Sequence, residues 1–164
     1  MASQQHDPWS GETGSDETGP RCGCMVAAAV VVVLVVGGIC TWYYVKSRAE
    51  EMNAVTASSG RVTLEKDNGD SLETIGRKEE PEIWYRVTLE NAPIGRELAL
   101  TCEWIDPSGR VAQRNQYQTK EITRTPWPTH ARYRLRPDAP LGSWTVRLLL
   151  DGRELRTRTF MVRD

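Results

Sequence analysis

The pattern of apolar and polar residues changes once along the chain, near residue 53. Residues 25–45 read MVAAAVVVVLVVGGICTWYYV, 21 residues without a charge. At a rise of about 1.5 Å per residue, a helix of that length measures roughly 31 Å, which matches the hydrocarbon core of a bilayer. The run therefore predicts a helix that spans a membrane once, and residues 46–53 are expected to form a short stalk.

After residue 53 apolar residues alternate with polar ones, which is the period of a strand with one buried face. Residues 82–90 show it most clearly, with one face made of Ile83, Tyr85, Val87 and Leu89. Asp106-Pro107-Ser108-Gly109 has the composition of a β-turn, and Asp151-Gly152 that of a two-residue type I′ hairpin.

Strands are expected at seven places, namely 61–66, 82–90, 98–104, a segment starting near 110, 132–136, 144–150 and 153–162. No helical stretch is expected after residue 53. Short strands at such intervals are typical of an all-β, antiparallel sandwich of about seven strands, here over residues 54–164. We expect the last strand to pair inside its sheet.

Charge divides the chain into an acidic leader and a balanced domain. Residues 1–24 hold four acids and one base, whereas residues 49–164 hold eighteen of each. The leader is rich in Gly, Ser, Thr and acid, a composition that predicts a disordered tail. A domain of balanced charge lacks the basic face of a nucleic-acid-binding protein, so no nucleic-acid partner is expected.

The four cysteines are Cys22, Cys24, Cys40 and Cys102. The domain holds only the last of them, so it has no internal disulfide. Cys22-Gly-Cys24 is too closely spaced for a redox or zinc motif. Thiols beside a membrane span are sometimes palmitoylated, but we assign no site to Cys22 or Cys24. No metal and no cofactor are expected.

The apolar run is longer than the core of a signal peptide and follows an acidic leader, so we expect it to remain as an anchor. The positive-inside rule compares Arg21 with Lys46 and Arg48 and favours a cytoplasmic domain. Analogy with disulfide-free β-sandwiches on bacterial N-terminal anchors favours the opposite side. We place the domain outside the cytoplasm and keep the cytoplasmic orientation as the alternative.

The last part of the chain, residues 140–162, contains a motif of regularly spaced Pro, Gly, Trp and Val residues. Pro140-Leu-Gly142-Ser-Trp144-Thr-Val146, followed by Asp151-Gly152 and Phe160-Met-Val162, has the spacing P-x-G-x-W-x-V…D-G…F-x-V. This segment resembles the last hairpin of bacterial immunoglobulin-like modules, and residues 60–162 look like small membrane-anchored sandwich domains of bacteria whose function is not established. The resemblance implies an immunoglobulin-like sandwich and brings no catalytic residue. The Cys…Trp…Cys pattern of antibody domains is absent.

Arg132, Arg134 and Arg136 alternate along one predicted strand and form the first candidate contact. Stacked guanidiniums repel unless water, carboxylates or an anionic partner intervene. The hypothesis is an anionic surface or headgroup bound by these three residues. The alternative is a solvent-facing row balanced by Glu103 and Glu154. Further arginines would adjoin the row if the strands paired in sequence, namely Arg147, Arg156 and Arg158.

Trp127 is the second candidate. Pro126 and Pro128 flank it and hold it in an extended loop, where an indole can contact a sugar or a partner peptide. The alternative is that Trp127 folds back and plugs the sandwich, because an exposed indole promotes association.

No enzyme is expected. The chain has two histidines, His6 and His130, and it has no G-x-S-x-G, P-loop, H-E-x-x-H or dinucleotide-binding motif, so no catalytic residue is assigned. We interpret the chain as a single-pass, membrane-anchored binding or scaffold module of the bacterial cell envelope with a protein or polymer partner. Two alternatives stay open: a regulatory subunit that acts through its membrane helix, where Gly37 and Gly38 offer a small face, and an enzyme with an unrecognised site.

Overall fold

The computed structural model describes residues 22–164. The chain divides into two compact units, residues 1–44 and residues 45–164. The predicted tail, residues 1–24, lies outside the described residues except for its last three, which begin the helix α1.

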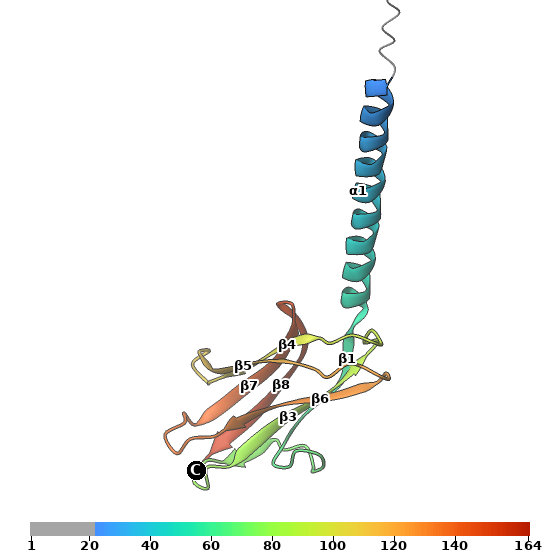
Figure 1. Ribbon diagram of the computed structural model, residues 1–164. Coiled ribbons are helices and arrows are strands. Elements are labelled where there is room, and N and C mark those ends of the chain that lie inside the picture. The colour runs from blue at the N-terminus through green and yellow to red at the C-terminus, as the bar shows by residue number, and fades with distance from the viewer. Residues whose placement is uncertain (1–21) are drawn as a thin grey trace, which may run out of the picture. The chain divides into compact units, whose positions relative to one another are not determined.

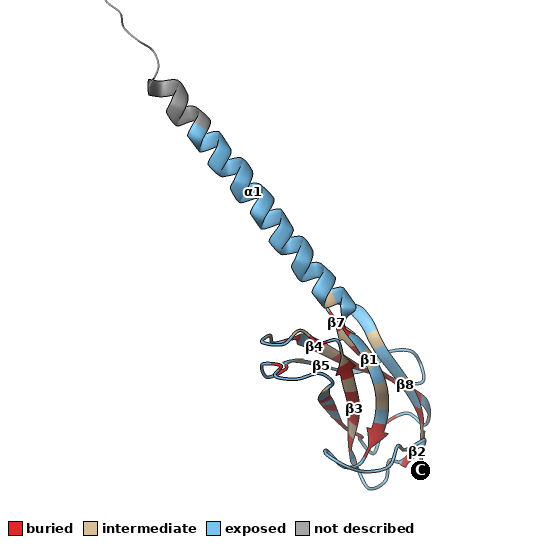
Figure 2. Cartoon of the chain, turned by 90° about the vertical axis from the view of Figure 1, so that its right-hand side faces the viewer, coloured by how far each residue is buried: buried red, intermediate tan, exposed pale blue. Residues whose placement is uncertain are grey.

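Helix α1 (Cys22–Ala54) contains the predicted span and continues through the predicted stalk. No side chain in the segment Ala29–Ala54 is buried (Figure 2). Its length and composition suit either a membrane span or a signal sequence. The helix ends where the Arg153 guanidinium donates hydrogen bonds to the carbonyl oxygens of Met52 and Val55, at 3.0 and 2.8 Å. These carbonyls lie at the helix end, where the last turn lacks partners of its own.

Eight strands follow α1 (Figure 1): β1 (Thr56–Thr63), β2 (Thr74–Gly76), β3 (Glu82–Glu90), β4 (Ala99–Ile105), β5 (Val111–Gln118), β6 (Trp127–Arg134), β7 (Gly142–Leu150) and β8 (Arg153–Arg163). They form a three-stranded sheet in the order β1-β3-β6 and a five-stranded sheet in the order β2-β8-β7-β4-β5. The prediction of an antiparallel sandwich is confirmed. The exception is the short strand β2, which pairs with β8 in parallel and was not predicted.

The strand order is that of an immunoglobulin-like fold. Strands A, B and E of that fold share one sheet and strands C, F and G the other. Here β1, β3 and β6 take the places of A, B and E, while β4, β7 and β8 take those of C, F and G. Strand β5 extends the second sheet beyond β4, as C′ does in variable-type domains. Among the described residues no strand takes the place of D.

Aromatic side chains fill the core between the two sheets. Trp104 of β4 stacks on Tyr133 of β6 with ring centroids 5.3 Å apart, and Trp144 of β7 stacks on Phe160 of β8 at 6.4 Å. Both indole N–H groups have acceptors, because Trp104 donates to Asn115 at 3.0 Å and Trp144 to the Pro140 carbonyl at 2.8 Å. Both indoles also meet Tyr133 of the other sheet, Trp144 at 5.6 Å, so they join the two sheets, and neither indole N–H is left unpaired.

Both predicted turns are confirmed. Asp151 and Gly152 have φ values of 50° and 81°, the two positive angles that a type I′ turn requires. In the turn after β4, the Gly109 N–H donates to the Asp106 carbonyl at 2.9 Å. Strand β8 lies between β2 and β7, so the last strand pairs inside its sheet as expected.

Candidate functional site

The outer face of the three-stranded sheet carries a row of basic side chains. Arg61 of β1 lies directly opposite Arg86 of β3, and Arg86 lies directly opposite His130 of β6. Each of the three faces away from the core, because its neighbours along the strand face inward. The loop after β1 adds Lys66 and Asp67, and these five residues line a pocket of about 250 Å³. We call the four basic residues, Arg61, Lys66, Arg86 and His130, the basic row.

Positive charge predominates in the basic row. No carboxylate within residues 22–164 forms an ion pair with Arg61, Lys66 or Arg86. Asp67 is the one carboxyl group that lines the pocket. Partial burial lowers the pKa of His130, the positive charges of Lys66 and Arg86 lower that pKa further, and Asp67 opposes them. The imidazole is therefore held neutral near pH 7.

Two hydroxyls and an indole adjoin the basic row on the same sheet face. The Ser59 hydroxyl donates to the Thr88 hydroxyl at 3.1 Å, and both residues line the same pocket. The His130 ring meets the Trp84 indole edge-on, with centroids 5.2 Å apart. The Trp84 indole thus contacts the imidazole of His130, which is an exposed residue.

The outer face of the five-stranded sheet carries a comparable row, but its central residue is an acid and lies between two arginines. Arg114 of β5, Glu103 of β4 and Arg147 of β7 are in register across three strands. The Glu103 carboxylate accepts from the Arg114 Nε at 2.8 Å and from the Arg147 Nε at 2.8 Å. Burial alone would raise the pKa of Glu103, but hydrogen bonds and charge from both guanidiniums outweigh it and hold the pKa below its usual range. A carboxylate here separates two arginines.

The predicted arginine row is exposed and paired with acids other than those expected. Arg132 meets Glu82 at 3.2 Å, Arg134 meets Glu80 at 3.8 Å and Arg136 meets Asp138 at 3.2 Å. The alternative that Glu103 and Glu154 balance this row is wrong, because both acids lie within 4 Å of arginines on the other sheet. Arg136 lies beyond the end of β6.

The further arginines do not adjoin this row either. Strand β6 pairs with β3 and not with β7, so Arg147 lies on the other sheet. Arg156 and Arg158 are in β8, opposite the inward-facing Leu148 and Val146. These arginines were expected beside the row only if the strands paired in sequence order. They do not, because the chain crosses from one sheet to the other after β6.

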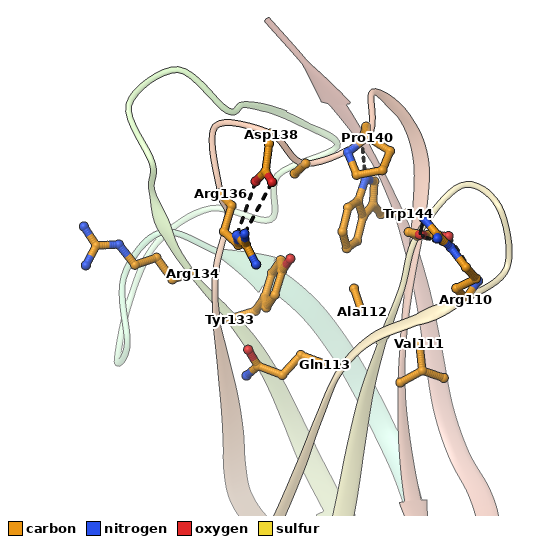
Figure 3. Close-up of a pocket in the computed structure, with 12 residues that line it drawn as sticks. Arg110, Val111, Ala112, Gln113, Tyr133, Arg134, Arg136, Asp138, Pro140 and Trp144 are labelled. Carbon is orange, nitrogen blue, oxygen red and sulfur yellow. Dashed lines mark hydrogen bonds and ion pairs between the residues drawn. The ribbon is translucent and has the colours of Figure 1, made fainter.

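A second pocket, of about 700 Å³, lies at one end of the sandwich (Figure 3). Tyr133 and Trp144 lie in it, and the charged pairs Arg136–Asp138 and Arg110–Asp106 stand at its rim. The Asp106 carboxylate accepts hydrogen bonds from Ser108 and Arg110, which hold its pKa at about 2. Because its rim cations already have acid partners, this pocket offers no unpaired charge to a ligand.

Trp127 is half-buried and packs against the core. It lies opposite Leu89 at the start of β6, on the strand face that Thr129 and Ala131 turn inward. The structure thus places the indole between the sheets and not on an extended exposed loop.

Cys102 is fully buried on the inner face of β4. Burial raises the pKa of its thiol to about 12, and the nearby Glu103 charge adds to the effect, so the thiol stays protonated. Within residues 22–164 no three His, Cys, Asp or Glu side chains gather in an arrangement that could hold a metal ion. The side chains of Cys22 and Cys24 lie outside the described residues.

Two solved bacterial structures are similar to this chain. One is the crystal structure of an immunoglobulin-like protein from Pseudomonas aeruginosa, with 18% identity, 66% of this chain and 96% of that chain covered, and a TM-score of 0.48. Another is the alkylpurine DNA glycosylase AlkC of Pseudomonas fluorescens bound to DNA that contains an abasic site analog, with 18% identity and a TM-score of 0.46. That match covers 67% of this chain and only 30% of the glycosylase.

No family model and no curated protein matches the sequence. The immunoglobulin-like assignment therefore stands on the strand order described above. The likeness extends to the fold and to no ligand or reaction.

The basic row was missed by sequence reasoning. Alternation along residues 82–90 placed Arg86 on the polar face, but alternation does not tell which residues of other strands lie opposite. A signal was present, since Arg61 and His130 each stand between residues that face inward in a strand. Recognising it required the pairing of β1 and β6 with β3.

Proposed function

We propose that this protein is a single-pass, membrane-anchored binding module of the bacterial cell envelope, with no catalytic activity of its own. The observation that carries the proposal is the uncharged run of residues 25–45, in a helix whose segment Ala29–Ala54 has no buried side chain and which leads directly into an immunoglobulin-like sandwich. Exposing an apolar segment of this length to water is strongly unfavourable, whereas burying it in a bilayer is favourable. A sandwich with polar outer faces is suited to contacts with a partner.

The proposal includes an extracytoplasmic position for the sandwich. It is supported by analogy with disulfide-free sandwich domains on N-terminal anchors of bacteria. The partner is proposed to be a protein or an envelope polymer.

The side of the membrane can be tested with one engineered thiol. Cys102 is fully buried and cannot report on accessibility. Lys120 is exposed in the segment between β5 and β6, and Lys120→Cys supplies a reactive thiol there. We expect a membrane-impermeant maleimide to label this variant on intact cells, in a background that carries Cys22→Ser, Cys24→Ser and Cys40→Ser.

The matched control is the same background with Lys120 retained, which should stay unlabelled because its one thiol is buried. Labelling of the Lys120→Cys chain only after lysis would place the sandwich in the cytoplasm and contradict the proposed position.

A further inference from the structure

We propose that the basic row, Arg61, Lys66, Arg86 and His130, binds a phosphate-type oxyanion. The inference deepens the proposed binding role by naming a ligand class, and it does not require the sandwich to be on a particular side of the membrane. The chemistry is that of a tetrahedral anion with several acceptor oxygens. Its source is either a soluble phosphate compound or a phospholipid headgroup.

The first argument is the register of the row. Like charges directly opposite one another in neighbouring strands destabilise a sheet. The protein avoids this cost on its other sheet, where Glu103 stands between Arg114 and Arg147. In the basic row the central place belongs to Arg86, with Arg61 on one side and His130 on the other. An anion from outside would stabilise this row as Glu103 stabilises the other one.

The second argument is the availability of the donors. Nine other arginines of residues 77–158 lie within 4 Å of a carboxylate, namely Arg77, Arg96, Arg110, Arg114, Arg132, Arg134, Arg136, Arg147 and Arg158. Arg61 and Arg86 have no such partner within the described residues. The same holds for Arg48, Arg124, Arg153, Arg156 and Arg163, but Arg61 and Arg86 are the two arginines that line the pocket of the basic row together. A guanidinium presents a fork of N–H donors that fits two oxygens of a phosphate.

The third argument is the composition of the pocket. Three cations, Arg61, Lys66 and Arg86, face one carboxylate, Asp67. The Thr88 hydroxyl, which accepts from Ser59 and keeps its own proton to donate, and the imidazole of His130 add neutral donors. Charged and neutral donors around a pocket of about 250 Å³ suit an anion of several oxygens better than an apolar or cationic ligand.

His130 provides a direct reporter of binding. The chain has one other histidine, His6, so a ¹³C-histidine-labelled sample gives two ring signals that a His6→Gln variant assigns. A bound anion favours the charged imidazolium, so it should raise the pKa of His130. We expect added inorganic phosphate to shift the His130 signal saturably in the full chain in uncharged detergent, and sodium chloride of equal ionic strength to leave it unshifted.

Variants separate the basic row from general surface charge. Arg86→Gln and, independently, Arg61→Gln should weaken phosphate binding at least about tenfold, since each removes a charged donor. Arg134→Gln is the matched control, because Arg134 lies on the same sheet face but is paired with Glu80. It should bind like the parent. Tryptophan fluorescence confirms that each variant is folded. A shift that is unsaturable, or that is equal in Arg86→Gln and the parent, overturns the proposal.

Two further arms identify the source of the anion. Glycerol phosphate is added to the chain in uncharged detergent, and the chain is separately placed in nanodiscs of phosphatidylcholine or phosphatidylglycerol without added phosphate. A His130 shift specific to phosphatidylglycerol and lost in Arg86→Gln supports a headgroup. A shift with glycerol phosphate alone supports a soluble or polymeric phosphate. No Arg86-dependent shift in either arm or with inorganic phosphate contradicts the site, while the thiol-labelling test of the anchor is unaffected.

Discussion

The hydroxyl of Tyr85 lies on the inner face of β3, where it has no hydrogen-bond partner among the described residues. Burial raises the pKa of this phenol above its usual range, although the charges of Arg156 and Arg158 on β8 lower it in part. Gly60 of β1 faces the same oxygen, and a β-carbon at that position would lie 2.7 Å from it. The lack of a side chain at Gly60 thus leaves room for the buried hydroxyl of Tyr85.

Tyr85→Phe is predicted to leave the domain as stable as the parent or to stabilise it by up to about 1 kcal/mol, because it removes a buried donor that has no partner. Tyr117→Phe is the matched comparison. The Tyr117 hydroxyl bonds with Thr129 at 3.1 Å, so its loss should destabilise the domain by about 1 kcal/mol. Denaturant unfolding of the two variants, followed by tryptophan fluorescence, measures both. A larger loss for Tyr85→Phe than for Tyr117→Phe would contradict the account.

Among the strands, the outer face of each sheet carries three residues directly opposite one another. They are Arg61, Arg86 and His130 on one sheet and Arg114, Glu103 and Arg147 on the other. In the row centred on Glu103 the acid satisfies two guanidiniums. Glu103 is 4% exposed, whereas the side chains of its partners Arg114 and Arg147 are 56% and 37% exposed, so water screens the two ion pairs in part. Removing the acid still leaves two neighbouring guanidiniums without an ionised partner. This row should therefore contribute to stability in a way that depends on pH.

We predict that the parent domain loses stability as the pH falls below about 4, the ordinary range of carboxyl groups. The pKa values of Glu103 and Asp106 are lowered by folding, to about 2 for Asp106. A lowered pKa means that the folded state favours the carboxylate, so the stabilisation is present above the unfolded pKa and is lost as the pH falls through the folded value. The free energy of unfolding between pH 7 and pH 2 measures it.

Glu103→Gln is the control for this pH dependence. At pH 7 it should destabilise the domain by about 1–3 kcal/mol, because two arginines lose an ionised partner. Its stability should also fall less than that of the parent at acid pH. An equally steep acid decline in Glu103→Gln would show that the row makes no ionisation-dependent contribution.

Whether an element could be predicted depends on whether the local sequence determines it. Seven strands and both turns were predictable because alternation and turn dipeptides are local properties. The bounds were less so, since β1 and β6 begin five residues before the expected 61–66 and 132–136 and end before them. Strand β2 was not, since three residues, Thr74–Gly76, are too short to show a period. The neighbours of Arg132 and Arg86 were not predictable either, because strand pairing between two sheets depends on the whole topology.

In the molecule as a whole, apolar side chains occur in two different settings, the core of the sandwich and one long helix. The sandwich buries its apolar faces internally, between two sheets. No side chain of the segment Ala29–Ala54 is buried, although the partly buried Met52 in its last turn packs against the sandwich core. The proposed bilayer anchor would remove the apolar part of this segment from water, whereas a signal sequence would be cleaved from the chain.

Carbonate extraction combined with mass analysis tests this central claim most directly. The chain is expressed in a bacterial host, membranes are washed at alkaline pH, and the mass of the chain is measured in the pellet and the supernatant. We predict that it stays in the pellet with the apolar segment Ala29–Ala54 intact. Release into the supernatant, or a mass that shows cleavage after the apolar segment, would contradict a membrane-spanning anchor.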